Sequence, residues 1–125
     1  MTSRVLLIED EANIAEAIRF ILGRDGHDVA WSADGEDMAG LMAIRPDLVI
    51  LDLMLPGRSG LEILTSLKAN AATRDIPVMM LSAKGQGRDR EAAERAGVQA
   101  FMTKPFANAE IREAVRALIK AGPVP

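Results

Sequence analysis

The sequence contains no cysteine, which excludes disulfide bonds, thiol nucleophiles and cysteine-based metal sites and fits a cytoplasmic location. Basic residues are also in the minority, with 15 Lys and Arg against 18 Asp and Glu, for a net charge of -3. This balance argues against direct contact with nucleic acid, which normally requires a basic face. No apolar run approaches the roughly 20 residues of a membrane span, and the N-terminus lacks the apolar core of a signal peptide, so we expect no membrane contact.

What the chain does have is enough apolar material for one full core, since 49% of its 125 residues are hydrophobic. Apolar runs alternate with segments in which apolar residues recur at helical spacing. The runs predict five strands, at Val5–Ile8, Val29–Trp31, Leu48–Leu53, Val78–Leu81 and Ala100–Thr103. The helical segments cover residues 14–22, 38–42, 61–67, 88–96 and 111–119.

This alternation predicts an α/β fold, with a doubly wound five-stranded parallel sheet and five helices distributed over both faces. Residues 1–121 form a single domain in this interpretation. Residues 122–125 are expected to fray as a C-terminal tail, because the two prolines and the glycine of "AGPVP" cannot continue a helix.

Polar residues of reactive types follow four of the five expected strands. Glu9 and Asp10 come after the first strand and Asp52 ends the third, while Ser82 ends the fourth and Lys104 follows the fifth. The carboxyl ends of parallel strands lie along one edge of a sheet, where such folds bind their ligands. The sequence therefore predicts that three carboxylates, a hydroxyl and an ammonium converge on one patch.

Crowded carboxylates repel one another, and a hard divalent cation such as Mg²⁺ or Mn²⁺ removes that cost. A cation beside a carboxylate, with an ammonium and a hydroxyl nearby, is an arrangement suited to phosphoryl transfer. The carboxylate can itself be the nucleophile and form an aspartyl phosphate. Each residue alone could be a helix cap, a turn residue or a solvated charge, but their occurrence at four strand ends favours a common site.

The motifs at these strand ends resemble those of the receiver domain of bacterial two-component response regulators, of the chemotaxis-regulator kind. The resemblance extends from about Arg4 to Lys120 and rests on the order, spacing and type of residues in four segments: "IED" (Ile8–Asp10), "LDLMLPGRSG" (Leu51–Gly60), "LSA" (Leu81–Ala83) and "FMTKPF" (Phe101–Phe106). It implies a flavodoxin-like fold with strand order 2-1-3-4-5.

The resemblance also implies roles for the residues that would bind metal and phosphoryl group. Asp52 matches the phosphoacceptor aspartate. Asp10 matches the main metal carboxylate, with Glu9, Asp52 and the backbone carbonyl of Met54 completing the ligands of Mg²⁺ or Mn²⁺. Lys104 matches the lysine that pairs with the phosphoryl group.

A second group of residues matches the switch of that family. Ser82 corresponds to the switch hydroxyl, the backbone N–H of Ala83 would face the phosphoryl group, and Phe101 corresponds to the switch aromatic. The family's Lys–Pro bond is cis, which predicts a cis bond between Lys104 and Pro105. Lys84 and Met54 occupy the positions that flank the water attacking the phosphorylated state, and we expect them to slow its loss.

The predicted function is therefore that of a signalling domain rather than an enzyme, although it would promote its own phosphorylation and dephosphorylation. It would accept a phosphoryl group from a sensor histidine kinase or a histidine phosphotransfer protein and signal to an effector or a fused output domain. The lone histidine, His27, precedes an expected edge strand and is interpreted as a loop residue. Trp31, on that strand, is expected to be a poor fluorescence reporter.

Three other functions would each require sequence features that differ from those of this chain. A phosphatase or phosphotransferase that forms an aspartyl phosphate would need an acid two residues beyond Asp52, where the sequence has Met54. A degenerate receiver acting only as an interaction domain would lack one of the site residues, and none is missing. A nucleotide-binding domain would need a glycine-rich loop after the first strand, and "EDEANIAEA" contains no glycine.

Overall fold

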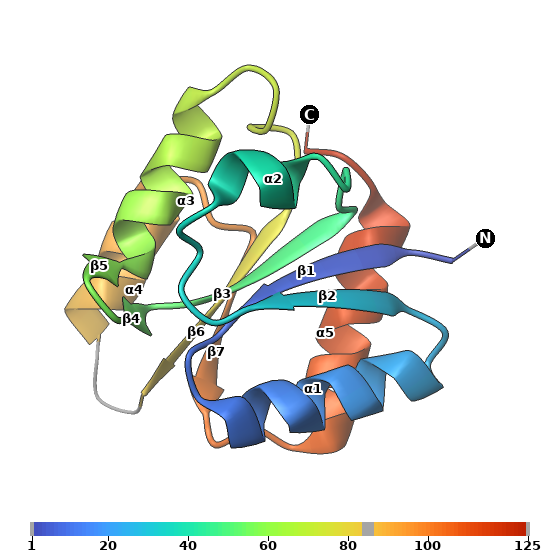
Figure 1. Cartoon of the computed structure of the whole chain (residues 1–125). Coiled ribbons are helices and arrows are strands. Elements are labelled where there is room, and N and C mark those ends of the chain that lie inside the picture. The colour runs from blue at the N-terminus through green and yellow to red at the C-terminus, as the bar shows by residue number, and fades with distance from the viewer. Residues whose placement is uncertain (1, 84–86, 125) are drawn as a thin grey trace.

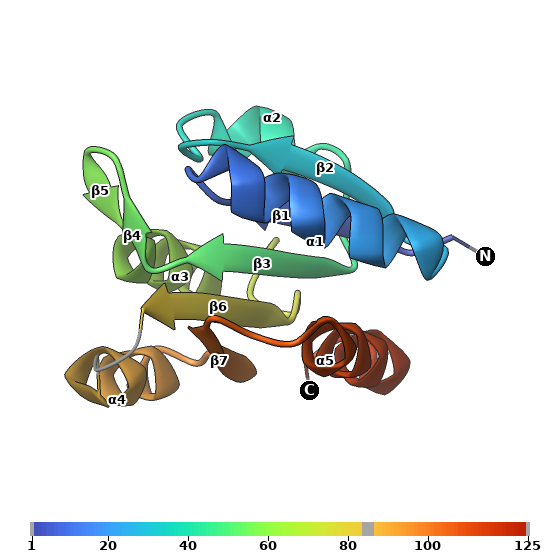
Figure 2. The same cartoon turned by 90° about the horizontal axis from the view of Figure 1, so that it is seen from below.

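The computed structural model describes residues 2–83 and 87–124. Its main sheet has five parallel strands in the order β2-β1-β3-β6-β7, which can be followed in Figure 2. These strands are β1 (Arg4–Ile8), β2 (Asp28–Ser32), β3 (Leu48–Asp52), β6 (Val78–Ala83) and β7 (Ala100–Lys104). With the small hairpin described below left aside, this order is the predicted 2-1-3-4-5, and the α/β prediction is confirmed.

Helices cover both faces of the sheet, with α1 and α5 on one face and α2, α3 and α4 on the other (Figure 1). The helices are α1 (Ala12–Arg24), α2 (Met38–Met42), α3 (Gly60–Ala69), α4 (Gly87–Arg95) and α5 (Asn108–Ala121). We call these two sides the α1/α5 face and the α2/α3/α4 face. No helix within the described residues is both long enough and apolar enough to span a membrane.

The pleat of the strands divides the core between the two faces. In β1, Val5 and Leu7 belong to the cluster under α1 and α5, whereas Leu6 and Ile8 belong to the cluster under the other three helices. All four side chains are fully buried. Successive side chains of a strand point to opposite faces, so the face of every later residue in a strand follows from this alternation.

A short antiparallel hairpin, β4 (Met54–Leu55) and β5 (Arg58–Ser59), follows β3 and was not predicted. Two-residue strands are too short for a period to be read from the sequence. Gly57 turns the hairpin at a φ of 75°, a left-handed conformation that glycine adopts without steric cost. The "PGRSG" segment, predicted only as a turn, therefore forms a small structured projection.

Gly60 brings the start of α3 against the end of β3. Its N–H donates a hydrogen bond of 2.7 Å to the carbonyl of Leu53. A Cβ at this position would collide with the backbone carbonyl oxygen of Asp52. The chain can therefore pass this close to the end of β3 only because residue 60 has no side chain.

Four predicted carboxyl ends of strands are wrong by one or two residues, since β2 ends at Ser32, β3 at Asp52, β6 at Ala83 and β7 at Lys104. Ser82 and Lys104 are thus held by ladder pairing, opposite Thr103 and Ala83 respectively. At the C-terminus, α5 ends at Ala121, and the N–H of Val124 donates 2.8 Å to the carbonyl of Asp75.

Candidate functional site

Three charged side chains meet at the carboxyl edge of the sheet. The ammonium of Lys104 lies 2.7 Å from Glu9 Oε1 and 3.1 Å from Asp52 Oδ2. It also lies 3.8 Å from Oε1 of Glu11, an exposed residue that sequence reasoning did not assign to the site. Strand alternation contributes to the meeting, because Asp52 of β3, Lys104 of β7 and Glu9, directly after β1, all fall on the α1/α5 face. The long Lys104 side chain reaches across β6, which lies between β3 and β7.

Burial and mutual contact set the protonation of this cluster. Glu9 is 0% exposed and Asp52 is 3% exposed. Burial, followed by the proximity of Asp52, raises the pKa of Glu9 to about 8. Burial also opposes ionisation of Asp52, but hydrogen bonds from Glu9 and Lys104 outweigh it and hold the pKa of Asp52 below its usual range. Both carboxyl groups therefore contact the Lys104 ammonium, and Glu9 takes up a proton more readily than Asp52 does.

Glu9, Asp10 and Asp52 could together hold a metal ion. Each of them offers one carboxylate oxygen, and these oxygens lie within 4.8 Å of one another. Asp10 is exposed and approaches from the solvent side, whereas Glu9 Oε1 is buried with no hydrogen-bond partner beyond its ion pair with Lys104. A buried carboxylate in that situation fits a hard dication with oxygen ligands, such as Mg²⁺ or Mn²⁺.

Met54 and the β4–β5 hairpin border the cluster on one side. The N–H of Met54 donates a hydrogen bond of 3.2 Å to Asp52 Oδ1, which leaves Oδ2 facing Lys104. Met54 is 63% exposed. The predicted ligation of a metal ion by the Met54 carbonyl stays a prediction.

Ser82 and Phe101 project on the α2/α3/α4 face, as the alternation in β6 and β7 requires. Ser82 is 2% exposed, and its hydroxyl donates a hydrogen bond of 3.3 Å to the carbonyl of Ala83. Phe101 is half-buried, and the guanidinium of Arg90 lies 5.7 Å from the centre of its ring. Lys84, which was assigned a role at the site, lies outside the described residues.

Trp31 was not predicted to take part in the site, but it contacts it. Its indole N–H donates a hydrogen bond of 2.8 Å to the backbone carbonyl of Glu9. Trp31 lies on the edge strand β2, as expected, and Arg19 of α1 sits 6.0 Å from its ring centre. Only the register of β1 against β2, which the sequence does not display, could have revealed this bond.

His27 lies at the opposite edge of the sheet, in the connection that leads into β2. Its Nε2 is 3.7 Å from Asp25 Oδ2. The interpretation of His27 as a loop residue therefore agrees with its position, away from the strand ends that hold Asp52. The Lys104–Pro105 bond is cis, as the resemblance implied.

Comparisons with known proteins agree with this geometry. The family model described as response regulator receiver domain matches residues 5–116. The phosphate regulon transcriptional regulatory protein PhoB of Klebsiella pneumoniae is 40% identical over 121 residues, which cover 96% of this chain and 53% of PhoB. The chain thus spans about half the length of the curated relatives it matches.

Solved structures show the same fold. The receiver domain of a signal transduction histidine kinase from Syntrophus aciditrophicus superposes with a TM-score of 0.88 at 27% identity, over 96% of this chain and 92% of that one. The receiver domain of a sensor histidine kinase from Pseudomonas aeruginosa, with magnesium coordinated in its active-site cleft, gives a TM-score of 0.82 at 27% identity, over 96% and 99%. On this evidence the chain belongs to the response regulator receiver domain family.

Proposed function

We propose that Asp52 is the residue at which this receiver domain accepts a phosphoryl group, from a phosphohistidine of a sensor histidine kinase or a histidine phosphotransfer protein. The observation that supports this most directly is the position of the Lys104 ammonium, 3.1 Å from Asp52 Oδ2 and 2.7 Å from Glu9 Oε1. It holds an ionised carboxylate in place at an edge of the sheet where a metal ion could also bind.

The residues of the site divide the work of phosphoryl transfer. An oxygen of Asp52 attacks phosphorus in line while the bond from phosphorus to the donor histidine nitrogen breaks. The Lys104 ammonium then pairs with the phosphoryl oxygens instead of with the carboxylates. Glu9, Asp10, Asp52 and the Met54 carbonyl would hold Mg²⁺ or Mn²⁺, which supplies positive charge to the transferred group.

The signal would pass from the phosphoryl group to the α2/α3/α4 face. The Ser82 hydroxyl exchanges its 3.3 Å bond with the Ala83 carbonyl for a phosphoryl oxygen, and the Ala83 N–H donates to another. Phe101, only half-buried, then turns into the space that Ser82 leaves. We infer that the surface formed by α4, β7 and α5 carries the result to an effector or a fused output domain in the cytoplasm.

The phosphorylated state would be lost slowly. Met54 has no group that can orient an attacking water by hydrogen bonding, and Lys84 is the second residue expected beside that water. Met54→Asn should therefore shorten the lifetime of the phosphorylated state, measured by the decay of intact phosphoprotein. An unchanged or longer lifetime would contradict the role of Met54.

The acceptor assignment is tested by exposing the protein to acetyl phosphate with Mg²⁺ and locating the modified residue by mass spectrometry. Asp52→Asn should abolish modification, while Asp28→Asn, at the other edge of the same sheet, should leave it unchanged. Lys104→Ala should allow some modification but remove the accompanying NMR shifts near Phe101. Modification of Asp52→Asn at the wild-type rate would overturn the assignment.

A further inference from the structure

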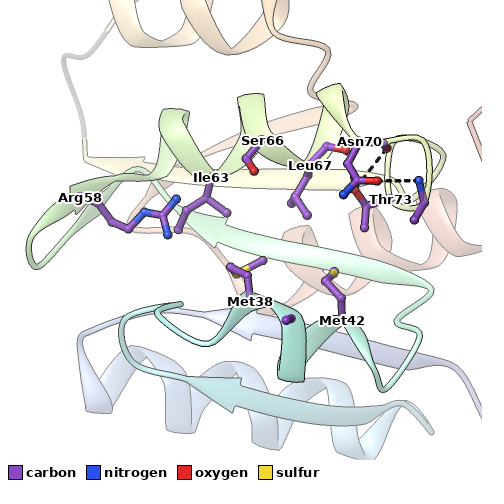
Figure 3. Close-up of a pocket in the computed structure, with 10 residues that line it drawn as sticks. Met38, Met42, Arg58, Ile63, Ser66, Leu67, Asn70 and Thr73 are labelled. Atoms are coloured by element: carbon purple, nitrogen blue, oxygen red, sulfur yellow. Dashed lines mark hydrogen bonds between the residues drawn. The ribbon is translucent and has the colours of Figure 1, made fainter.

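A cavity of about 320 Å³ lies between α2 and α3, on the α2/α3/α4 face (Figure 3). None of the residues that line it belongs to the acidic cluster at the strand ends. The space is partly open to solvent, so it is a pocket at the surface and not an enclosed void in the core. It falls at the lower end of the range of small-molecule sites, about 300–1,000 Å³.

The cavity exists because α2 covers the sheet incompletely. This helix has only five residues, and none of them is fully buried. Its Met38 and Met42 face Ile63 and Leu67 of α3 across the gap (Figure 3). Methionine side chains are flexible and polarisable, so this wall of the cavity can adjust its shape to a bound molecule.

The two ends of the cavity carry different kinds of polar side chain. Arg58, from β5, lies at one end, and Asn70 and Thr73 lie at the other (Figure 3). Thr73 is satisfied within the protein, since its hydroxyl donates a bond of 2.7 Å to the Leu67 carbonyl. The Asn70 side-chain oxygen accepts from the N–H of Ala72 at 2.9 Å, which leaves its amide N–H₂ as a donor.

Arg58 is the feature that gives the cavity a preference of charge. Its side chain is half-buried, yet it forms no ion pair with any carboxylate in residues 2–83 and 87–124. A guanidinium presents a planar fork of donors that matches a carboxylate in two parallel hydrogen bonds. The end of the cavity at Arg58 is therefore complementary to a carboxylate, and the walls between Arg58 and Asn70 are complementary to an apolar chain.

We propose that this cavity binds a small monocarboxylate with an extended apolar body. Arg58 pairs with the carboxylate, Met38, Met42, Ile63 and Leu67 surround the body, and Asn70 closes the far end. A water molecule occupies about 30 Å³ of liquid volume, so the cavity has room for about ten non-hydrogen atoms. Octanoate is of this size, and its dissociation constant should be on the order of 0.1–1 mM for so few atoms.

The experiment compares octanoate with octanamide, its neutral counterpart, by NMR titration of the isotope-labelled full chain. Octanoate should shift resonances of α2 and α3. Arg58→Gln should weaken octanoate about tenfold and leave octanamide unchanged, since only the anion uses the charge. Arg58→Lys should recover part of the loss. Ser66→Leu, which fills the cavity from α3, should weaken both probes, with Ser66→Ala as the size control.

The proposal fails if octanoate produces no shifts at about 10 mM, or if its shifts map outside α2 and α3. Equal binding of both probes to wild type and to Arg58→Gln would show a purely apolar cavity and would also overturn it. None of these outcomes depends on phosphorylation of Asp52, so the result is independent of the function proposed above.

Discussion

The two faces of the sheet are covered in different ways. On one face, α1 and α5 have 13 and 14 residues and enclose a continuous cluster of buried side chains. On the other, α2, α3 and α4 have 5, 10 and 9 residues, and a cavity of about 320 Å³ separates the first two. The site divides along the same line, because Glu9, Asp52 and Lys104 project on the first face while Ser82 and Phe101 project on the second.

The two faces therefore separate the residues that would bind the phosphoryl group from the residues that would change position in response. The charges that would receive a phosphoryl group belong to the face where long helices restrict movement. The hydroxyl and the aromatic ring that would respond belong to the face with short helices and unfilled space, where side chains can change position at lower cost. We therefore expect the α2/α3/α4 face, which we call the adaptable side, to change more on phosphorylation than the core under α1.

The largest effects should come from matched truncations on the two faces. Leu22→Ala in α1 should lower the free energy of unfolding by about 4 kcal/mol and Leu67→Ala in α3 by about 2 kcal/mol. Leu22 is fully buried, whereas Leu67 is 5% exposed and borders the cavity. Truncation of Leu67 therefore removes fewer van der Waals contacts. Urea denaturation measures both variants. Equal losses would contradict the difference in packing between the faces.

A second effect, on the order of a few kcal/mol, is a dependence of the free energy of unfolding on pH, caused by Glu9. The pKa of Glu9 is raised, by burial first and then by Asp52, from an ordinary 4.5 to about 8. The folded protein then keeps a proton that the unfolded chain loses, so this stability is fully present below pH 4.5 and is lost as pH rises through about 8.

This pH dependence is measured by urea denaturation across that range without divalent metal. Glu9→Gln cannot ionise and should remove the decline, and Mg²⁺ should reduce it in wild type because a dication stabilises the ionised form. Asp28→Asn, exposed at the opposite edge, serves as the control and should decline as wild type does. A decline in Glu9→Gln equal to that of wild type would refute the protonation of Glu9.

A smaller effect, about 1 kcal/mol, is expected from the hydrogen bond between the Trp31 indole and the Glu9 carbonyl. Trp31→Phe should weaken Mg²⁺ binding by about three- to tenfold, as followed by NMR at Asp10 and Asp52. Because Trp31 is the only tryptophan, its fluorescence in the wild type should also change with Mg²⁺, contrary to the sequence-based expectation. If Mg²⁺ leaves the wild-type fluorescence unchanged and Trp31→Phe binds Mg²⁺ as tightly as wild type, Trp31 does not influence the site.

The smallest effect concerns the adaptable side. Arg90→Ala removes the cation above the Phe101 ring and should cost about 0.5 kcal/mol. Its larger consequence should be a shift in the Phe101 ring resonances, because the ring loses one of the contacts that hold its orientation. Arg88→Ala, in the same helix and also exposed, is the control. Identical Phe101 resonances in all three proteins would show that Arg90 does not restrain the ring.

Much of this arrangement follows from the sequence. The alternation of apolar runs and helical segments predicted the parallel sheet, the family resemblance implied its strand order, and the residues at the strand ends predicted the meeting of Asp52 with Lys104. Other features depend on quantities that no short pattern contains. The bond from Trp31 to Glu9 requires strand register, and the cavity beside Met38 depends on where a five-residue helix comes to rest. Local polarity does not distinguish buried Glu9 from exposed Asp10, although the alternation from Val5 and Leu7 does.

The close approach of Gly60 to the end of β3 has a consequence in genetic terms. The Cβ of any other residue there would collide with the backbone carbonyl of Asp52. The charged residues of the site would all still be present. A survey of substitutions scored for signalling should therefore find Gly60 as intolerant as Asp52 itself. Gly23, in α1 with open space around it, should accept alanine without loss. An inactive allele at position 60 would look like a loss of chemistry, although its cause would be steric.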